Sequence, residues 1–88
     1  MTLTNDGTPD VSYGNQFLTG GTTDITDFEE GHLGQTITIK AKHTLDIMDG
    51  GNLELAGSDF NMNSGDTIQL TMFETDVWSE ISRSVNST

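Results

Sequence analysis

The chain has 88 residues, a net charge of −11 from fourteen Asp and Glu against three Lys and Arg, and no cysteine. This charge disfavours nucleic acid and anionic membranes as partners, because binding to either depends on basic side chains. Without cysteine neither a disulfide nor a cysteine-ligated zinc ion can stabilise so small a core, which leaves oligomerisation. We therefore predict that the chain is not a stable monomer.

Residues 1–23 are rich in Thr, Gly, Asn and Asp, and their apolar side chains are sparse. We predict an extended N-terminal arm that is ordered by contact with something else, as chain termini often are. Val11, Tyr13 and Phe17 are its candidate partner-binding residues, with Leu18 as a further apolar anchor.

Residues 24–88 form a small β domain in this interpretation, because short alternating segments recur between turn clusters such as "DGG", "NSGD" and "ETD". The first apolar residues of successive segments lie 8, 8, 7 and 8 positions apart. Regular short strands at this spacing, without a helical period, predict an all-β fold. One face of these strands carries an apolar ladder that consists of Ile37, Ile39, Leu45, Ile47, Leu53, Leu55, Phe60, Met62, Ile68, Leu70 and Met72.

One chain of this length is expected to have too little material to cover the apolar ladder with a second layer. Packing several identical chains around a symmetry axis would cover it. The pattern thus predicts a trimeric β-prism or β-helix-like assembly, with the ladder as subunit interface and core. The alternative is a small monomeric sandwich or barrel.

The segment "DVWSEISRSV" predicts one further alternating face, formed by Val77, Ser79, Ile81, Arg83 and Val85. Trp78 is interpreted first as closing the end of the strand stack. The alternative is an aromatic platform for a sugar or a partner protein. Arg83 is expected to pair with a carboxylate, either Glu80 or one on a neighbouring subunit.

No motif indicates chemistry. The acidic loops "DIMDGGN" and "GSDFNMNSGD" offer oxygens for calcium, but neither has the order of an EF-hand loop, and turn formation explains them. His32 and His43 are not at a metal-ligand spacing. A nucleophile elbow and a phosphate-binding glycine loop are both missing. We predict no catalytic residue, no metal, no cofactor and no enzyme activity.

Four segments in order, "TPDVSYGNQFLTG", "TTDITDFEEGHLGQTITI", "NLELAGSDFNMNSGDTIQLTM" and "VWSEISRSVN", span about residues 8 to 86. Together they resemble a short module at the C-terminal end of bacteriophage tailspike and tail-fibre proteins. The resemblance implies a trimeric, all-β virion structural module. It carries over no catalytic residues, because in such tailspikes the sugar-cleaving groups belong to a larger β-helix.

Only seven residues precede these segments, so we expect a stand-alone module. The resemblance then implies a homotrimeric capsid decoration (cement) protein on the virion, which bridges and stabilises phage coat subunits. Its arm would lie along the coat. The alternative is a trimerising tip of a tail fibre or tailspike that contacts host-surface glycan through Trp78 or Tyr13.

Overall fold

The structure is a computed structural model that describes residues 1–87, and in this range it is all-β, as predicted. Seven strands are present and the described residues contain no helix. They are β1 (Gln16–Leu18), β2 (Thr36–Lys40), β3 (Leu45–Ile47), β4 (Leu53–Glu54), β5 (Phe60–Met62), β6 (Thr67–Glu74) and β7 (Val77–Ser84).

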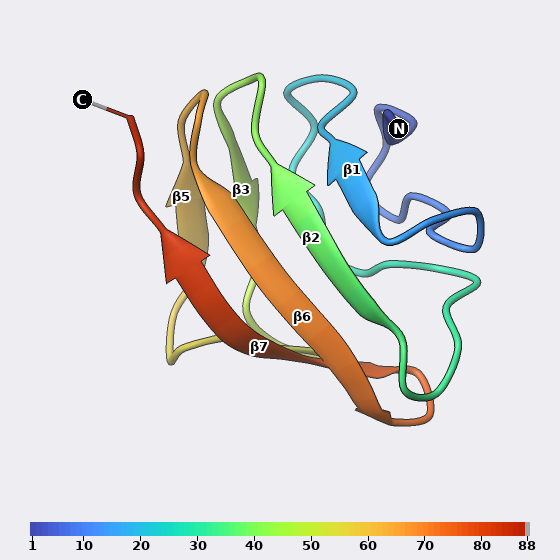
Figure 1. The fold of residues 1–88 in the computed structure, drawn as a ribbon. Helices are drawn as coiled ribbons and strands as arrows, with labels where there is room; N and C mark the ends of the chain where they lie inside the picture. The colour runs from blue at the N-terminus through green and yellow to red at the C-terminus, as the bar shows by residue number, and fades with distance from the viewer. Residues whose placement is uncertain (88) are drawn as a thin grey trace.

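The strands form two sheets, called here the large and the small sheet. The large sheet has the order β1-β2-β6-β7-β4, and the small sheet pairs β3 with β5. β6 pairs antiparallel with both β2 and β7, whereas β1 joins β2, and β4 joins β7, in parallel. Figure 1 shows the small sheet behind the large one, as a second layer.

The core lies between these layers because the strands alternate. In β2, Ile37 and Ile39 point inward and are fully buried, while the residues beside them are exposed or half-buried. Side chains from both sheets join one hydrophobic cluster. The accessible surface of the chain is 4542 Å², below the roughly 5,000 Å² typical of a monomeric protein of this mass. One chain therefore covers its apolar face by itself, contrary to the expectation from the sequence.

The apolar ladder lies in this single-chain core. Leu55 is partly buried and packs against the cluster, and the remaining ladder residues are buried. Because these side chains already contact one another within the chain, a contact with a second copy of this fold has to use other residues.

Residues 1–23 pack against the edge of the large sheet. β1 extends this sheet beside β2, and Thr2 forms a bridge to Leu18 on the outer side of β1. Val11 and Phe17, two of the candidate partner-binding residues, are buried in the core of the chain. Burial leaves Tyr13 as the exposed member of that set.

A β-bulge at Ile81 changes which residues of β7 face the core. Gln69 pairs with Ser82 and Leu70 with Glu80, so Ile81 is the extra residue. Before the bulge Trp78 and Glu80 are buried, and after it Arg83 lies over the ring of Phe60. The predicted face of β7 was wrong, because strict alternation does not hold across a bulge. Two of its members, Ile81 and Val85, are exposed.

Candidate contact surface

The outer face of the large sheet carries rows of hydroxyl and amide side chains. One row crosses four strands, with Gln16 beside Thr38, Thr38 beside Gln69 and Gln69 beside Ser82. The Gln69 Nε2 donates to Thr38 Oγ1 at 3.1 Å, and Ser82 Oγ donates to Gln69 Oε1 at 3.0 Å. The side chains of this row are thus fixed by one another.

Two further rows flank it. Thr36 and Thr71 share a hydrogen bond between their hydroxyls at 2.8 Å, and Ser79 Oγ donates to Glu54 Oε1 at 3.0 Å. The row on the other side pairs Leu18 with Lys40, Lys40 with Thr67 and Thr67 with Ser84. We name the whole surface the hydroxyl–amide face, and it consists of Gln16, Leu18, Thr36, Thr38, Lys40, Thr67, Gln69, Thr71, Ser79, Ser82 and Ser84.

This face is almost free of acidic residues, although the chain has fourteen. Within the strands of the large sheet the acids are Glu54, Glu74 and Glu80. Glu54 lies on the edge strand β4, Glu74 ends β6, and the Glu80 side chain is buried. A second copy of the chain would meet less electrostatic repulsion here than at the acidic loops.

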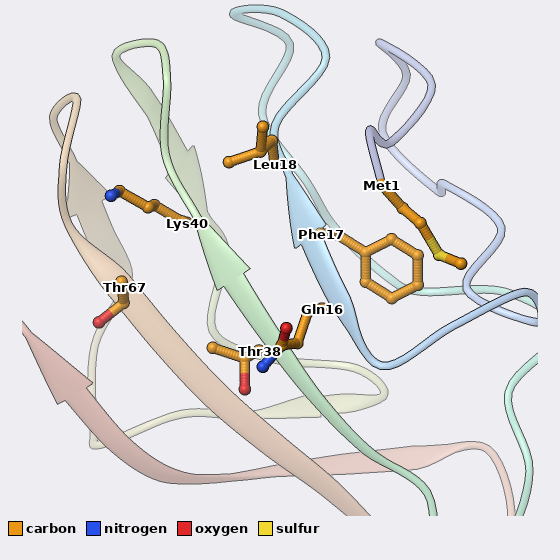
Figure 2. A pocket seen from close by; sticks show the side chains of 7 residues that line it. All are labelled: Met1, Gln16, Phe17, Leu18, Thr38, Lys40 and Thr67. Carbon is orange, nitrogen blue, oxygen red and sulfur yellow. The ribbon is translucent and has the colours of Figure 1, made fainter.

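A hollow of ≈ 320 Å³ opens on this face at its β1 end, lined by Met1, Gln16, Phe17, Leu18, Thr38, Lys40 and Thr67. In Figure 2, Leu18, Lys40 and Thr67 come from three neighbouring strands, while Gln16 and Thr38 form the row below them. The lining is largely apolar with one cation at its rim, so it fits an uncharged or anionic group better than a cation.

A second hollow, of ≈ 300 Å³, is acidic and is lined by Asp27, Phe28, Glu29, Glu30, Asn52 and Asp76. Asp27 uses both carboxylate oxygens locally, accepting from the Phe28 amide and from Asn52 Nδ2. Among residues 1–87 no group of three His, Asp or Glu side chains is placed to hold a metal ion. We assign no ligand to this hollow.

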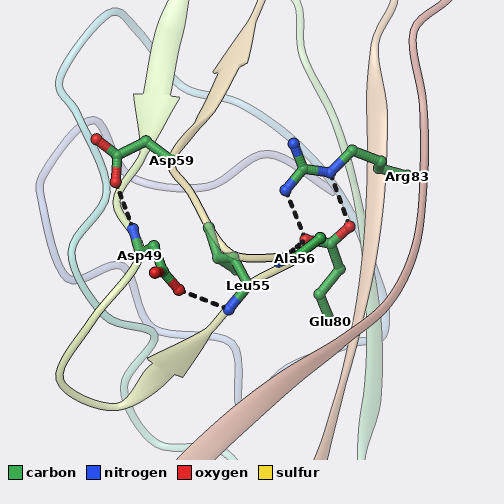
Figure 3. A network of polar contacts seen from close by, with 6 residues as sticks. All are labelled: Asp49, Leu55, Ala56, Asp59, Glu80 and Arg83. Carbon is green, nitrogen blue, oxygen red and sulfur yellow. Dashed lines mark hydrogen bonds and ion pairs between the residues drawn. The ribbon is translucent and has the colours of Figure 1, made fainter.

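The acidic loops use their oxygens to build turns. Asp49 Oδ1 accepts the Leu55 amide at 2.9 Å, and Asp59 Oδ1 accepts the Asp49 amide at 2.7 Å (Figure 3). His43 Nδ1 hydrogen-bonds to Thr19 Oγ1, while His32 is exposed in a loop. These contacts give Asp49, Asp59 and His43 structural roles.

Trp78 is fully buried in the core. Its indole N–H donates to the Phe28 carbonyl at 3.2 Å, and the two rings meet edge to face at 6.1 Å between centroids. A Cβ on Gly31 would lie 2.4 Å from Trp78 Cζ2, so glycine is required there for packing. Since Trp78 presents no ring face to solvent, Tyr13 is left as the candidate sugar platform.

Glu80 and Arg83 form the ion pair expected from the sequence. Arg83 donates to both carboxylate oxygens at 2.7 Å, and Glu80 Oε1 also accepts the Ala56 amide (Figure 3). The hydrogen bond from Arg83 lowers the pKa of Glu80, burial opposes this effect, and the Ala56 amide adds to it. The guanidinium lies 4.2 Å from the ring centroid of Phe60. The pair therefore closes the space between β7 and the small sheet as a neutral unit.

Asp66 holds the C-terminal segment. It is buried, and its carboxylate accepts the backbone amides of Asn63, Asn86 and Ser87 at 2.8 to 2.9 Å. The Asn63 amide contributes most to lowering the pKa of Asp66, burial opposes it, and the Ser87 and Asn86 amides add to the lowering. An ionised Asp66 thus fixes the chain just beyond β7.

Comparison with protein-family models, curated proteins and solved structures finds no match to this chain. No helix long and apolar enough to cross a membrane occurs in residues 1–87. The functional assignment therefore depends on the surface chemistry described above and on the sequence motifs.

Proposed function

We propose that the protein is a structural component of a bacteriophage virion, a homotrimeric capsid decoration protein that bridges and stabilises coat subunits. The observation that carries the proposal is the hydroxyl–amide face, which is nearly free of acids on a chain of net charge −11. The resemblance to a trimeric phage tail module and the all-β fold support the same conclusion.

The trimer is proposed to form through the hydroxyl–amide face. Three sheet faces can meet around a three-fold axis as the sides of a prism, and the acidic loops then point outward. The rows of Thr, Ser and Gln can exchange hydrogen bonds within a chain for hydrogen bonds between chains, so their polar groups need not be left unpaired on burial.

The coat contact is proposed to use the exposed side chains of residues 1–23, the predicted arm. Outside the hydroxyl–amide face, Met1 and Tyr13 are the large apolar residues exposed there. Deleting the segment would remove Val11 and Phe17 from the core. Single surface substitutions, such as Tyr13→Ala, are therefore the cleaner test of capsid binding.

Electron microscopy of the intact virion tests the assignment. The proposal predicts density of three-fold symmetry at junctions between coat capsomers, built from trimers of the chain. Density confined to the tail would reject the decoration role.

The second candidate function is a trimerising tail tip that contacts host-surface glycan. The specific observation in its favour is the hollow of ≈ 320 Å³ beside the exposed β1–β2 surface. A glycan array separates the two functions, because saccharide binding that is lost in Leu18→Lys would favour the tip. Absence of any signal would leave the decoration role.

A further inference from the structure

One half of β7 is a free sheet edge. β4 pairs only with Trp78 and Ser79, whereas β7 continues to Ser84. No strand of the described residues lies beside the second half on that side. Ile81 in this half-strand and Val85, which follows its last residue, are 50% and 67% exposed. An unpaired strand edge is a template for another strand.

The free half-strand is held at both ends. Glu80 at its start is fixed by Arg83 and by the Ala56 amide. Beyond its end, the Asp66 carboxylate binds the amides of Asn86 and Ser87. A strand that is already ordered loses little conformational entropy when a partner adds to it.

The sequence of this segment is nearly symmetric about Arg83, since it reads Ile81, Ser82, Arg83, Ser84, Val85. In an antiparallel pair centred on Arg83, Ile81 faces Val85 of a second copy and Ser82 faces Ser84. Each pairing occurs twice, once on either side of the axis. Apolar residues opposite one another stabilise antiparallel strands.

The charges permit this pairing. Residues 81–87 contain no acid. Two Arg83 side chains would meet near the axis, but each is neutralised by its own Glu80 and lies on Phe60. The bulge at Ile81 leaves its side chain exposed, where it can contact Val85 of the second copy.

We propose that two copies of the chain pair antiparallel along the free edge of β7, with a two-fold axis at Arg83. This contact goes beyond the proposed function, because it uses the strand edge and not the hydroxyl–amide face. An isologous edge contact closes as a pair. With its two-fold axes perpendicular to the three-fold axis of the trimer, it joins two trimers into six copies.

The first test is the mass in solution of the wild type and of Ile81→Lys/Val85→Lys, by sedimentation equilibrium. The matched control is Tyr13→Lys/Leu33→Lys, whose two residues are 45% and 66% exposed and which changes the charge equally. We expect six copies for the wild type and three for the edge variant, with the pairing constant weakened at least about tenfold. The control should keep six.

The outcomes separate the two contacts. A wild-type mass of two copies, halved only in the edge variant, supports edge pairing and rejects the trimer. A mass of three supports the trimer and overturns edge pairing, and a single copy overturns both. An equal decrease of the assembly mass in the control variant would also overturn edge pairing.

Cross-linking tests the register directly. The chain has no cysteine, so in Ser82→Cys/Ser84→Cys any disulfide between chains must join these positions. Both also belong to the hydroxyl–amide face, so the edge variant has to serve as the control that separates the two contacts. Residues directly opposite in antiparallel strands are within disulfide range. Mild oxidation should give a covalent dimer of twice 9.5 kDa. The same cysteines combined with Ile81→Lys/Val85→Lys should not cross-link. Equal yields in both variants, or none in either, would overturn the register.

Discussion

The two faces of the large sheet are built from the same strands but differ in their residue types and in their burial. On the inner face, Ile37 and Ile39 of β2 join the core, whereas on the outer face Thr36 and Thr38 lie in the hydroxyl–amide rows. The inner face is complete within one chain. The outer face contributes little to the core, yet acids are nearly excluded from it, so its composition points to contact with another molecule.

Removing the largest inner side chain should have the largest effect on stability. We expect Trp78→Ala to cost about 3–5 kcal/mol in the free energy of unfolding, because it leaves a cavity beside Phe28 and an unpaired Phe28 carbonyl. Urea denaturation followed by circular dichroism measures this. The control, Tyr13→Ala, removes an exposed ring and should cost much less. Equal losses in the two variants would place Trp78 outside the core.

Asp66→Asn tests the attachment of the C-terminal segment. The amide has one acceptor oxygen where the carboxylate has two, so at least one of three backbone amides loses its partner. We expect a loss of about 1–3 kcal/mol. Hydrogen exchange should accelerate at one or more of the Asn63, Asn86 and Ser87 amides, and the exchange of β2 should change far less. Unchanged exchange at these amides would contradict the role of Asp66.

Acid should destabilise the fold by protonating the carboxylates of Asp66 and Glu80. The pKa values of Asp66 and Glu80 are lowered below their ordinary values of 3.8 and 4.5. As the pH falls, these two carboxyl groups therefore take up protons in the unfolded state before they do so in the folded state. The stability that they contribute above about pH 4.5 is lost as the pH falls through their lowered pKa values in the folded state. Melting temperatures from pH 7 to pH 2 measure this, and Asp66→Asn should flatten the acid limb. An identical limb in wild type and variant would contradict it.

Much of the inner face could be predicted from the sequence. The alternation in "TITIK" and the spacing of Leu45, Leu53 and Phe60 gave the strands and the core residues, because period-two patterns survive in a half-buried sheet. Burial of Val11 and Phe17 could not be predicted, since tertiary packing alone orders the irregular segment that contains them. The inward turn of Trp78 and Glu80 was hidden by the bulge at Ile81.

The residue types of the outer face are visible in the sequence, whereas their assembly into one surface is not. Thr36, Thr38, Gln69 and Thr71 alternate with the apolar ladder in "TITIK" and "TIQLTM". Their alignment into rows depends on the register of β2, β6 and β7, which short-range patterns do not determine. The lack of acids in these segments was the signal that could have identified the contact surface.

The central claim is that the hydroxyl–amide face joins copies of the chain, and the mass in solution of Thr38→Glu/Gln69→Glu tests it most directly. The two carboxylates lie opposite each other in the middle row and replace its hydrogen bonds, so we expect the free energy of unfolding to fall by about 1–2 kcal/mol, and circular dichroism checks that the variant is still folded. The matched control, Ser58→Glu/Asn61→Glu, adds the same charge at exposed positions away from the face. We predict that three-fold assembly is lost in the face variant and kept in the control. A folded wild type without three-fold assembly, or equal loss in both variants, would contradict the account.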